Sequence, residues 1–384
     1  RIAGYTYMMD AARTLTARAV DLGEKPSVAS AIVKYQLTEH MRRVVNDAMD
    51  IQGGSGICLG PRNFMGRVYQ ALPISITVEG ANLLTRALII YGQGAVRCHP
   101  YVLQEMRAVA EPDTRRAVKN FDEAIFGHVR YTISNVARAF WLGLTSARLV
   151  SPPVDGPTRR YIQKLTRLSA AFALISDIAM LTLGGALKRK EKISGRFADV
   201  LSYMYLASAV IKRFEDDGRP VEDIPLMHYA CQYCLHEAEK MLVVILKNFP
   251  NTFLAWLMGG LVFPGGRRNH VPDDRMNHDC ACLLLESSAA RDRLTRGIYL
   301  PTTTRDALGR LEDALPKVIA AEPLERKLAK LAEDYPLLHG DHEAQVKAAL
   351  ARNVLSAAEA KLVRSAYAAR RDVIAVDDFP ADKI

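Results

Sequence analysis

The sequence Ile76-Thr77-Val78-Glu79-Gly80-Ala81-Asn82 places a single carboxylate between an apolar β-branched run and a glycine. Apolar and polar residues alternate from residue 74 to Val78, and this alternation favours an extended, half-buried segment that leads to Glu79. A carboxylate at its end would lie in apolar surroundings, where an ionised carboxyl group is a stronger base. The alternative is that Glu79 lies in the first turn of a following helix, because an acidic residue there complements the helix dipole. Spacing alone favours this second interpretation.

A glycine-rich stretch, Gln52-Gly53-Gly54-Ser55-Gly56, precedes that segment. It does not follow a predicted strand and is not followed by Lys-Ser or Lys-Thr, which excludes both the P-loop and the dinucleotide fingerprint. A pair of glycines does allow the backbone of another chain, or a ligand, to approach closely. The stretch is therefore a candidate contact site.

Apolar residues recur at intervals of three or four along most of the chain, which predicts an all-α fold. Three helices, at residues 2–22, 27–49 and 80–91, predict an antiparallel bundle with short connections. The pattern then predicts four longer helices, which indicate a second bundle, at residues 120–149, 158–188, 195–214 and 221–247. Breaks at His99-Pro100 and Glu111-Pro112 mark the boundary between the predicted domains, 1–110 and 111–384. From residue 273 onward we expect shorter helices.

The chain has 384 residues, of which 49% are hydrophobic and 24% charged, as is usual for globular proteins. Helical spacing begins at Ile2, directly after Arg1, so we expect a piece of a longer protein. The most apolar region, residues 241–263, is interrupted at Lys247 and Pro250. Its pieces are too short for ~30 Å of hydrocarbon, which takes about 20 apolar residues to cross. We expect this region to be core; the alternative is a surface that enters a membrane interface.

The formal net charge of +9 is spread along the chain, with local basic clusters. Such clusters attract phosphate-bearing partners, including nucleic acid, anionic lipid headgroups and coenzyme A. They lie at Lys188-Arg189-Lys190-Glu191-Lys192, Arg159-Arg160 and Arg267-Arg268. No aromatic residues are interleaved with them and no nucleic-acid motif accompanies them, so we predict no nucleic-acid partner. Each cluster by itself is typical of a solvated surface.

Six cysteines include Cys231-x-x-Cys234 and Cys280-x-Cys282, a spacing that zinc sites also use. The first pair lies in a continuous helical pattern without the turn that a zinc site needs, and buried cysteine commonly acts as a small hydrophobic residue. We therefore predict no metal. Since no dense framework of cysteines is present, we expect reduced thiols and a cytoplasmic location.

The glycine pair followed by Val78-Glu79-Gly80-Ala81-Asn82, with Arg86 beyond, resembles the C-terminal helical domain of the acyl-CoA dehydrogenases. Residues 23–103 resemble the large bacterial long-chain members more closely still. Two features depart from the family pattern. Ala81 stands where most members have threonine, so a hydroxyl contact to the flavin is missing or replaced. Gln52 is one residue nearer the glycines than usual, which leaves Met49 or Asp50 as the alternative match for the family's glutamine.

The resemblance implies a flavoenzyme of fatty acid β-oxidation with FAD as cofactor. Glu79 would be the catalytic base that removes a proton from C2 of a fatty acyl-CoA while a hydride leaves C3 for the flavin, giving a trans-2-enoyl-CoA. The implied cofactor-binding residues are Gln52, Gly53 and Gly54, beside the ADP part of FAD, together with Gly80, Ala81 and Asn82.

The family's FAD is often held by a neighbouring subunit, which implies a homo-oligomer, and an electron-transfer flavoprotein or similar acceptor would take the electrons. The family's N-terminal helical and middle β-domains are not present, so we expect no activity from this chain by itself. A different class of function stays open, a non-catalytic helical module for dimerisation or membrane attachment. In either case the second domain could contact the inner membrane peripherally through its basic clusters.

Overall fold

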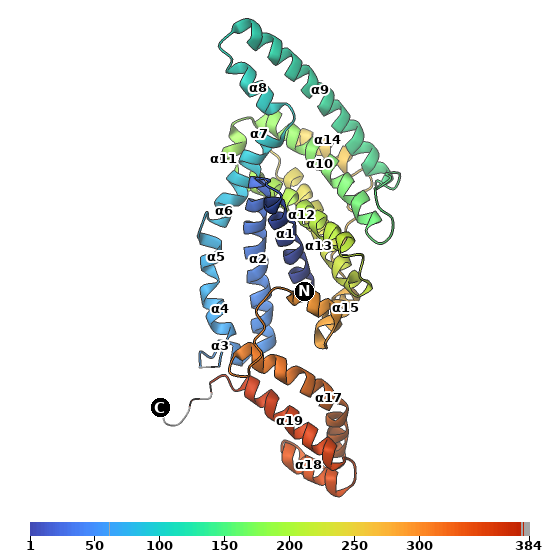
Figure 1. Ribbon diagram of the computed structural model, residues 1–384. Helices are drawn as coiled ribbons and strands as arrows, with labels where there is room; N and C mark the ends of the chain where they lie inside the picture. Colours follow the sequence, from blue (N-terminus) through green and yellow to red (C-terminus); the bar gives the residue numbers. More distant parts are fainter. Residues whose placement is uncertain (61, 378, 380–384) are drawn as a thin grey trace. The chain divides into compact units, whose positions relative to one another are not determined.

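A computed structural model describes residues 1–60, 62–377 and 379, and the described residues contain helices and no β-strand (Figure 1). This confirms the predicted all-α fold. Packing divides the chain into two compact units. Unit 1 comprises Arg1–Arg42 and Pro73–Ala281, and unit 2 comprises Arg43–Leu72 and the described residues from Cys282 onward.

Unit 1 is built from helices on both sides of the predicted domain boundary. Its elements are α1 (Ile2–Asp21), the first part of α2 (Ser27–Gln52), α5 (Pro73–Thr77), α6 (Asn82–Leu84), the π-helix η1 (Thr85–Gln93), α7 (Gly94–Cys98), α8 (Val102–Val109), α9 (Thr114–Thr145), α10 (Arg159–Leu183), α11 (Ala186–Arg189), α12 (Glu191–Asp216), η2 (Val221–Asp223), α13 (Ile224–Lys247), α14 (Thr252–Val262) and most of α15 (Asp274–Leu285).

Helix α12 forms the centre of unit 1. It packs most extensively on α13, and α1, η1 and α10 also lie against it (Figure 1). Its side chains Phe197, Leu206 and Phe214 are fully buried. Because α1 and η1 pack on α12, residues from both predicted domains share one core. The sequence boundary at residue 110 stays a prediction, and the end of the predicted second domain, at residue 384, lies outside the described residues.

Helix α10 is long and apolar enough to cross a membrane by length and composition alone. In the structure it packs against α9, α12 and α13, and half of its apolar window is buried. A helix buried in this way is typical of the core of a globular domain. The apolar region at residues 241–263 forms the end of α13 and the separate helix α14.

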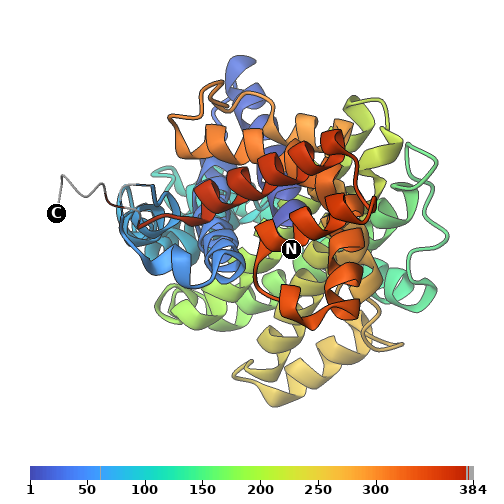
Figure 2. The same cartoon turned by 90° about the horizontal axis from the view of Figure 1, so that it is seen from below.

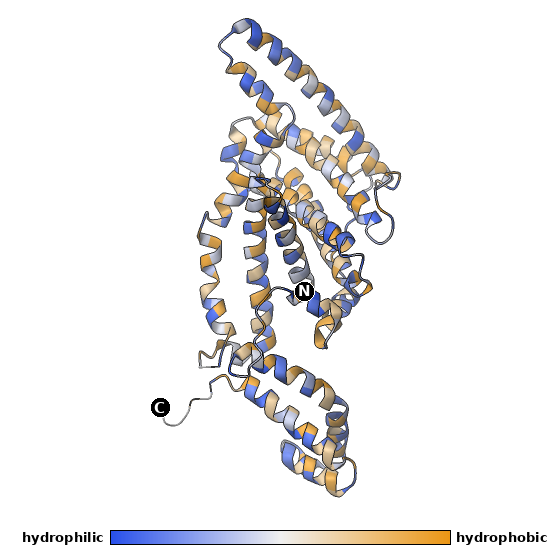
Figure 3. Cartoon of the chain, in the orientation of Figure 1, coloured by the Kyte–Doolittle hydropathy of each residue, from blue (hydrophilic) through white to orange (hydrophobic). Residues whose placement is uncertain are grey.

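Helix ends follow local signals that are visible in the sequence. Helix α9 begins earlier than predicted because the Asp113 carboxylate accepts hydrogen bonds from the backbone N–H groups of Arg115 and Arg116. It ends at Thr145, and the C-cap residue Ser146 has a φ of 53°, in the left-handed region. Hydrophilic and hydrophobic residues are interspersed along the whole of α9 (Figure 3).

The segment before Glu79 is helical, so the prediction of an extended segment is wrong. Helix α5 begins at Pro73, which is favourable at a first helical position, and the N–H of Val78 donates to the carbonyl of Ile74 over 3.0 Å. An alternation of five residues is too short to distinguish a strand period from a helical one.

Unit 2 contains the rest of α2 with α3 (Gly54–Ile57), α4 (Met65–Ala71), the end of α15, α16 (Ala289–Thr295), α17 (Ala307–Asp334), η3 (Pro336–Leu338), α18 (His342–Ala351) and α19 (Ala357–Ile374). Helices α17 and α19 lie side by side (Figures 1 and 2). Helix α17 has 28 residues, so the expectation of shorter helices after residue 273 is wrong for this element. Pro316 and Pro323 do not end it, because Leu324, Leu328 and Leu331 bury against α18 and α19.

Candidate functional site

Glu79 lies in a short loop between α5 and α6 in which two consecutive residues have left-handed backbone conformations. The φ angles are 53° for Glu79 and 95° for Gly80. Glycine adopts this conformation freely, but a glutamate there is uncommon and costs on the order of 1–3 kcal/mol. The loop must therefore be held in place by its surroundings.

Helix α2 holds the loop. Lys34 Nζ donates to the Gly80 carbonyl oxygen and to Asn82 Oδ1, each over 2.7 Å. Asn82 Nδ2 in turn donates to Thr38 Oγ1 and Glu39 Oε1, each over 2.9 Å. Both ends of the Asn82 amide are thus bonded within the protein, so this predicted cofactor residue fixes the loop.

The Glu79 side chain is exposed, so the expectation that this chain buries the carboxylate is wrong. Apolar residues do surround it in sequence, and they are exposed too: Val78 at 47%, Leu83 at 78% and Leu84 at 48%. An apolar surface of this kind is typical of a region that another molecule or domain covers. Glu79 also lies outside the first turn of α6, since Gly80 and Ala81 intervene.

The Glu79 backbone N–H has no hydrogen-bond acceptor among the described residues. Ala81 has an extended conformation and leads directly into α6, with its carbonyl accepting from the N–H of Thr85 over 2.9 Å. The loop thus presents a carboxylate and a free N–H donor from the same residue.

The glycine-rich stretch belongs to unit 2, whereas the Glu79 loop belongs to unit 1. Gln52 is the last residue of α2, and its Oε1 is buried without a hydrogen-bond partner among the described residues. Gly53 has a φ of 62°, and a Cβ placed at either Gly53 or Gly54 would meet nothing within 4 Å. An unpartnered acceptor beside an open glycine backbone fits the approach of a ligand such as FAD. The cofactor roles of these residues stay predictions.

A second polar cluster, which sequence reasoning did not find, lies between α8, α9 and α10. His128 Nε2 lies 2.8 Å from Asp177 Oδ1, and His128 Nδ1 lies 2.7 Å from Glu105 Oε1. Thr132 Oγ1 donates to Asp177 Oδ2 over 2.6 Å. Since both ring nitrogens of His128 face carboxylates, both donate and the ring is an imidazolium. Burial lowers the pKa of His128, but its hydrogen bonds to Asp177 and Glu105 outweigh this, so the pKa is raised.

His99 completes the cluster in a neutral form. Its Nδ1 accepts from the backbone N–H groups of Tyr101 and Val102, over 3.2 Å and 3.1 Å, so the proton lies on Nε2. Nε2 is 3.2 Å from Asp177 Oδ1, but the N–H direction is too poor for a hydrogen bond, and this buried donor is left incompletely satisfied.

The ligand atoms of His99, His128 and Asp177 lie within 4.8 Å of one another, close enough to suggest a metal site. With His128 between the carboxylates of Glu105 and Asp177, these residues form an ion-pair network that connects three helices. A metal ion would have to displace ring protons to bind there.

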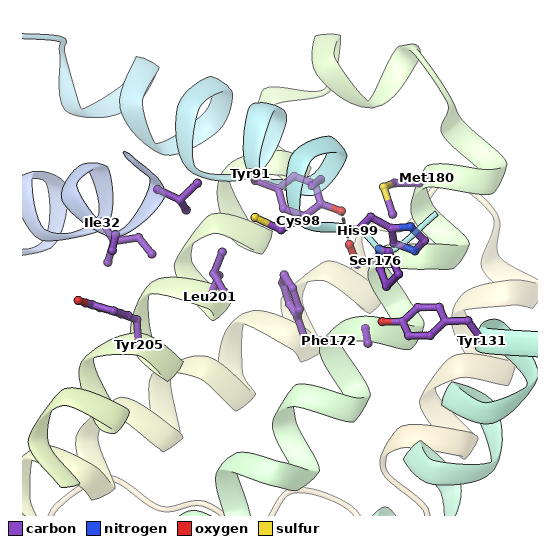
Figure 4. Close-up of a pocket in the computed structure, with 16 residues that line it drawn as sticks. Ile32, Tyr91, Cys98, His99, Tyr131, Phe172, Ser176, Met180, Leu201 and Tyr205 are labelled. Atoms are coloured by element: carbon purple, nitrogen blue, oxygen red, sulfur yellow. Dashed lines mark hydrogen bonds between the residues drawn. The ribbon is translucent and has the colours of Figure 1, made fainter. Parts of the chain in front are cut away.

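Beside this cluster is an apolar cavity of about 380 Å³ between α2, η1, α7, α9, α10 and α12 (Figure 4). His99 lines it, with Tyr131 from α9 and Ser176 from α10. His99 and Tyr131 are the residues from which the sequence could have indicated this cavity. They lie far from Ser176 in sequence, and only packing brings the three residues together.

The cysteine pair of the discarded zinc hypothesis lies inside α13. Cys231 and Cys234 are fully buried, and burial raises the pKa of both thiols well above the ordinary value. These thiols stay protonated and pack as small hydrophobic groups. None of the described cysteines forms a disulfide.

Two family models match nearly the whole chain. The model described as "Acyl-CoA dehydrogenase, C-terminal, bacterial type" matches residues 96–379, and "Acyl-CoA dehydrogenase, C-terminal domain" matches residues 1–92. Among solved structures, an acyl-CoA dehydrogenase complexed with FAD from Bacillus anthracis is similar, with a TM-score of 0.52 and 17% identity. The match covers 74% of this chain and 47% of that one, so the chain spans about half the length of that protein. At this identity the likeness concerns the fold.

Proposed function

The chain belongs to the acyl-CoA dehydrogenase family, and on that premise we propose that it is the C-terminal part of an FAD-dependent enzyme of fatty acid β-oxidation. The family assignment confirms the resemblance seen in the sequence. The proposed reaction converts a fatty acyl-CoA into a trans-2-enoyl-CoA. The observation that carries this proposal is the Glu79 loop, which Lys34 holds in a left-handed conformation amid exposed apolar residues.

In the proposed reaction Glu79 removes the proton from C2 of the acyl chain. Its exposed carboxylate would become a stronger base when an acyl chain and neighbouring domains cover the apolar residues around it, because they would exclude water. The free backbone N–H of Glu79 can donate to the thioester oxygen and stabilise the charge that develops there. One residue then supplies both the base and an oxyanion donor.

FAD, when bound, supplies the acceptor for the hydride that leaves C3. Gln52, Gly53 and Gly54 are the residues proposed to hold it, since the buried Gln52 Oε1 lacks a partner among the described residues and the glycines present open backbone. Ala81 has no hydroxyl to offer the flavin, so any contact there comes from its backbone. We propose a homo-oligomer in which the loop at Gln52, Gly53 and Gly54 binds the FAD of a neighbouring subunit. An electron-transfer flavoprotein or similar acceptor would take the electrons from the flavin.

The experiment that tests this function is anaerobic mixing of the FAD-loaded complete protein with a saturated fatty acyl-CoA. We expect loss of the oxidised-flavin absorbance and formation of the enoyl-CoA in equal amounts. A flavin that stays oxidised with acyl-CoAs of every chain length would contradict the proposal and favour the non-catalytic helical module.

We also propose a peripheral membrane contact, with the protein in the cytoplasm at the inner membrane. The two tryptophans of the chain support it, because both are exposed: Trp141 on α9 at 54% and Trp256 on α14 at 74%. Helices α9 and α14 pack together, and Phe253 lies beside Trp256 with ring centroids 6.2 Å apart. Exposed tryptophan is typical of membrane interfaces.

Vesicle co-sedimentation at low and high salt tests this contact. The whole chain is needed, since α1 packs on α12 and the second half cannot be cut away without exposing the core. We expect binding to anionic vesicles that weakens with salt, because exposed basic residues such as Lys188 and Arg267 each contribute about 1 kcal/mol near an anionic surface. Replacing Trp256 with serine should reduce it. Absence of binding at low salt would leave α9 and α14 as surfaces for another protein.

A further inference from the structure

The cavity beside the His99 cluster has the size and the walls of a small-molecule site. Its volume of about 380 Å³ falls within the range of about 300–1,000 Å³ that ligand pockets occupy. Apolar side chains line most of it, among them Ile32, Phe172 and Leu201. Tyr91 forms a rigid part of the wall, because its ring stacks on Phe197 at 4.6 Å between centroids and 9° between planes.

Most polar groups of the lining lie at one end of the cavity, while the Tyr205 hydroxyl, at the other end, is bonded to Thr16. Figure 4 shows His99, Ser176 and the hydroxyl of Tyr131 at the polar end, with Ile32 and Leu201 at the other. The Tyr131 hydroxyl points into the cavity and has no hydrogen-bond partner among the described residues. The rings of His99 and Tyr131 meet edge to face, with centroids 5.4 Å apart.

The charges behind this end determine which ligand it can accept. The cavity-lining groups themselves are neutral: a phenol, a serine hydroxyl bonded to Tyr91 over 2.6 Å, and the neutral ring of His99. Behind His99 the single imidazolium of His128 faces the two carboxylates of Glu105 and Asp177, which leaves one excess negative charge. That charge repels an anionic headgroup, whereas a neutral oxygen can accept a hydrogen bond from Tyr131.

We propose that this cavity binds a neutral amphiphile, a molecule with an aliphatic body and an uncharged oxygen, such as a medium-chain alcohol or ester. The aliphatic part would lie along Ile32, Phe172 and Leu201, and the oxygen would accept from the Tyr131 hydroxyl. The site is additional to the proposed dehydrogenation, since Glu79 does not line the cavity.

Isothermal titration calorimetry with 1-octanol and octanoate at neutral pH tests the proposal on the whole chain without any turnover. We expect 1-octanol to bind at one site and octanoate to bind at least about tenfold more weakly, because its carboxylate meets the excess negative charge. Octanoate binding as tightly as 1-octanol, or no binding of 1-octanol up to its solubility limit, would overturn the proposal.

Variants locate the binding in this cavity. Ala173→Phe places a ring in the cavity and should abolish 1-octanol binding, whereas Ala137→Phe makes the same change at an exposed position of α9 and should leave it unchanged. Circular dichroism establishes that both variants fold. Unchanged binding by a folded Ala173→Phe protein would overturn the proposal.

A milder pair of variants tests the polar end even if Ala173→Phe does not fold. Tyr131→Phe removes the free hydroxyl and should weaken 1-octanol binding about three- to tenfold. Tyr205→Phe is the matched control, because Tyr205 lines the same cavity but its hydroxyl is bonded to Thr16 Oγ1 over 2.7 Å. Equal affinities in the two variants would contradict the role given to Tyr131.

Discussion

Lys34 Nζ lies 2.7 Å from the carbonyl oxygen of Gly80, and this hydrogen bond connects α2 to the loop that carries Glu79. Lys34→Met should lower the free energy of unfolding by about 1–3 kcal/mol, because it removes charged hydrogen bonds to Gly80 and Asn82. It should also speed amide hydrogen exchange in the loop. Urea unfolding and exchange measurements check both, with the exposed Lys25→Met as control. Exchange at the wild-type rate would show that Lys34 does not hold the loop.

Arg86 and Asp199 join η1 to α12 within unit 1. Arg86 Nε donates to Asp199 Oδ1 over 2.7 Å, and its terminal nitrogen contacts Oδ2, which makes the pair bidentate. Asp199→Ala leaves a guanidinium unpaired in a largely buried place and should lower the free energy of unfolding by about 3 kcal/mol. The double variant Arg86→Met with Asp199→Leu should recover part of that loss. A double variant as unstable as the sum of the single variants would show that the two residues do not interact.

The His128 cluster predicts a pH dependence with a definite sign. The pKa of His128 is raised by its carboxylate partners, so its stabilisation is complete below the ordinary value of 6.5 and is lost as pH rises through the folded pKa. Burial raises the pKa of Asp177, but the close approach of His99 Nε2 and the hydrogen bonds from His128 and Thr132 outweigh this and lower it. Its stabilisation is therefore complete above the ordinary value of 3.8 and is lost as pH falls through the folded pKa.

The difference in unfolding free energy between wild type and His128→Gln should therefore be greatest between about pH 4 and pH 6.5 and shrink at alkaline pH. Urea unfolding across this range measures it. His270→Gln, at an exposed histidine, is the control and should differ little from wild type at any pH. A difference for His128→Gln that stays constant into alkaline pH would contradict the ionised state assigned to this ring.

Gly54 allows a clean test of the cofactor loop, because a Cβ there meets nothing within 4 Å and its φ is not left-handed. Gly54→Val should change the free energy of unfolding by about 0.5 kcal/mol or less. If the backbone contacts FAD, flavin content per protein should nevertheless fall. Gly185→Val makes the same change at another open glycine of ordinary φ and should retain flavin. Equal flavin content in the two variants would count against the loop assignment.

Local signals in the sequence predicted most long helices, and α10, α12 and α13 lie close to the predicted ranges. The five residues before Glu79 were mispredicted because so short a segment fits two periods equally well. The cluster of His99, His128 and Asp177 could not be predicted, since it arises only when α9 packs on α10. The left-handed conformation of Glu79 likewise depends on Lys34, far away in sequence.

Flavin reduction by the Glu79→Gln variant decides directly whether Glu79 is the base. Glutamine keeps the shape of the side chain but cannot accept the proton, so the FAD-loaded complete protein should retain its fold and flavin. Mixed anaerobically with a fatty acyl-CoA that reduces the wild-type flavin, this variant should reduce its flavin at least about a thousandfold more slowly. Reduction at close to the wild-type rate would show that another group removes the proton.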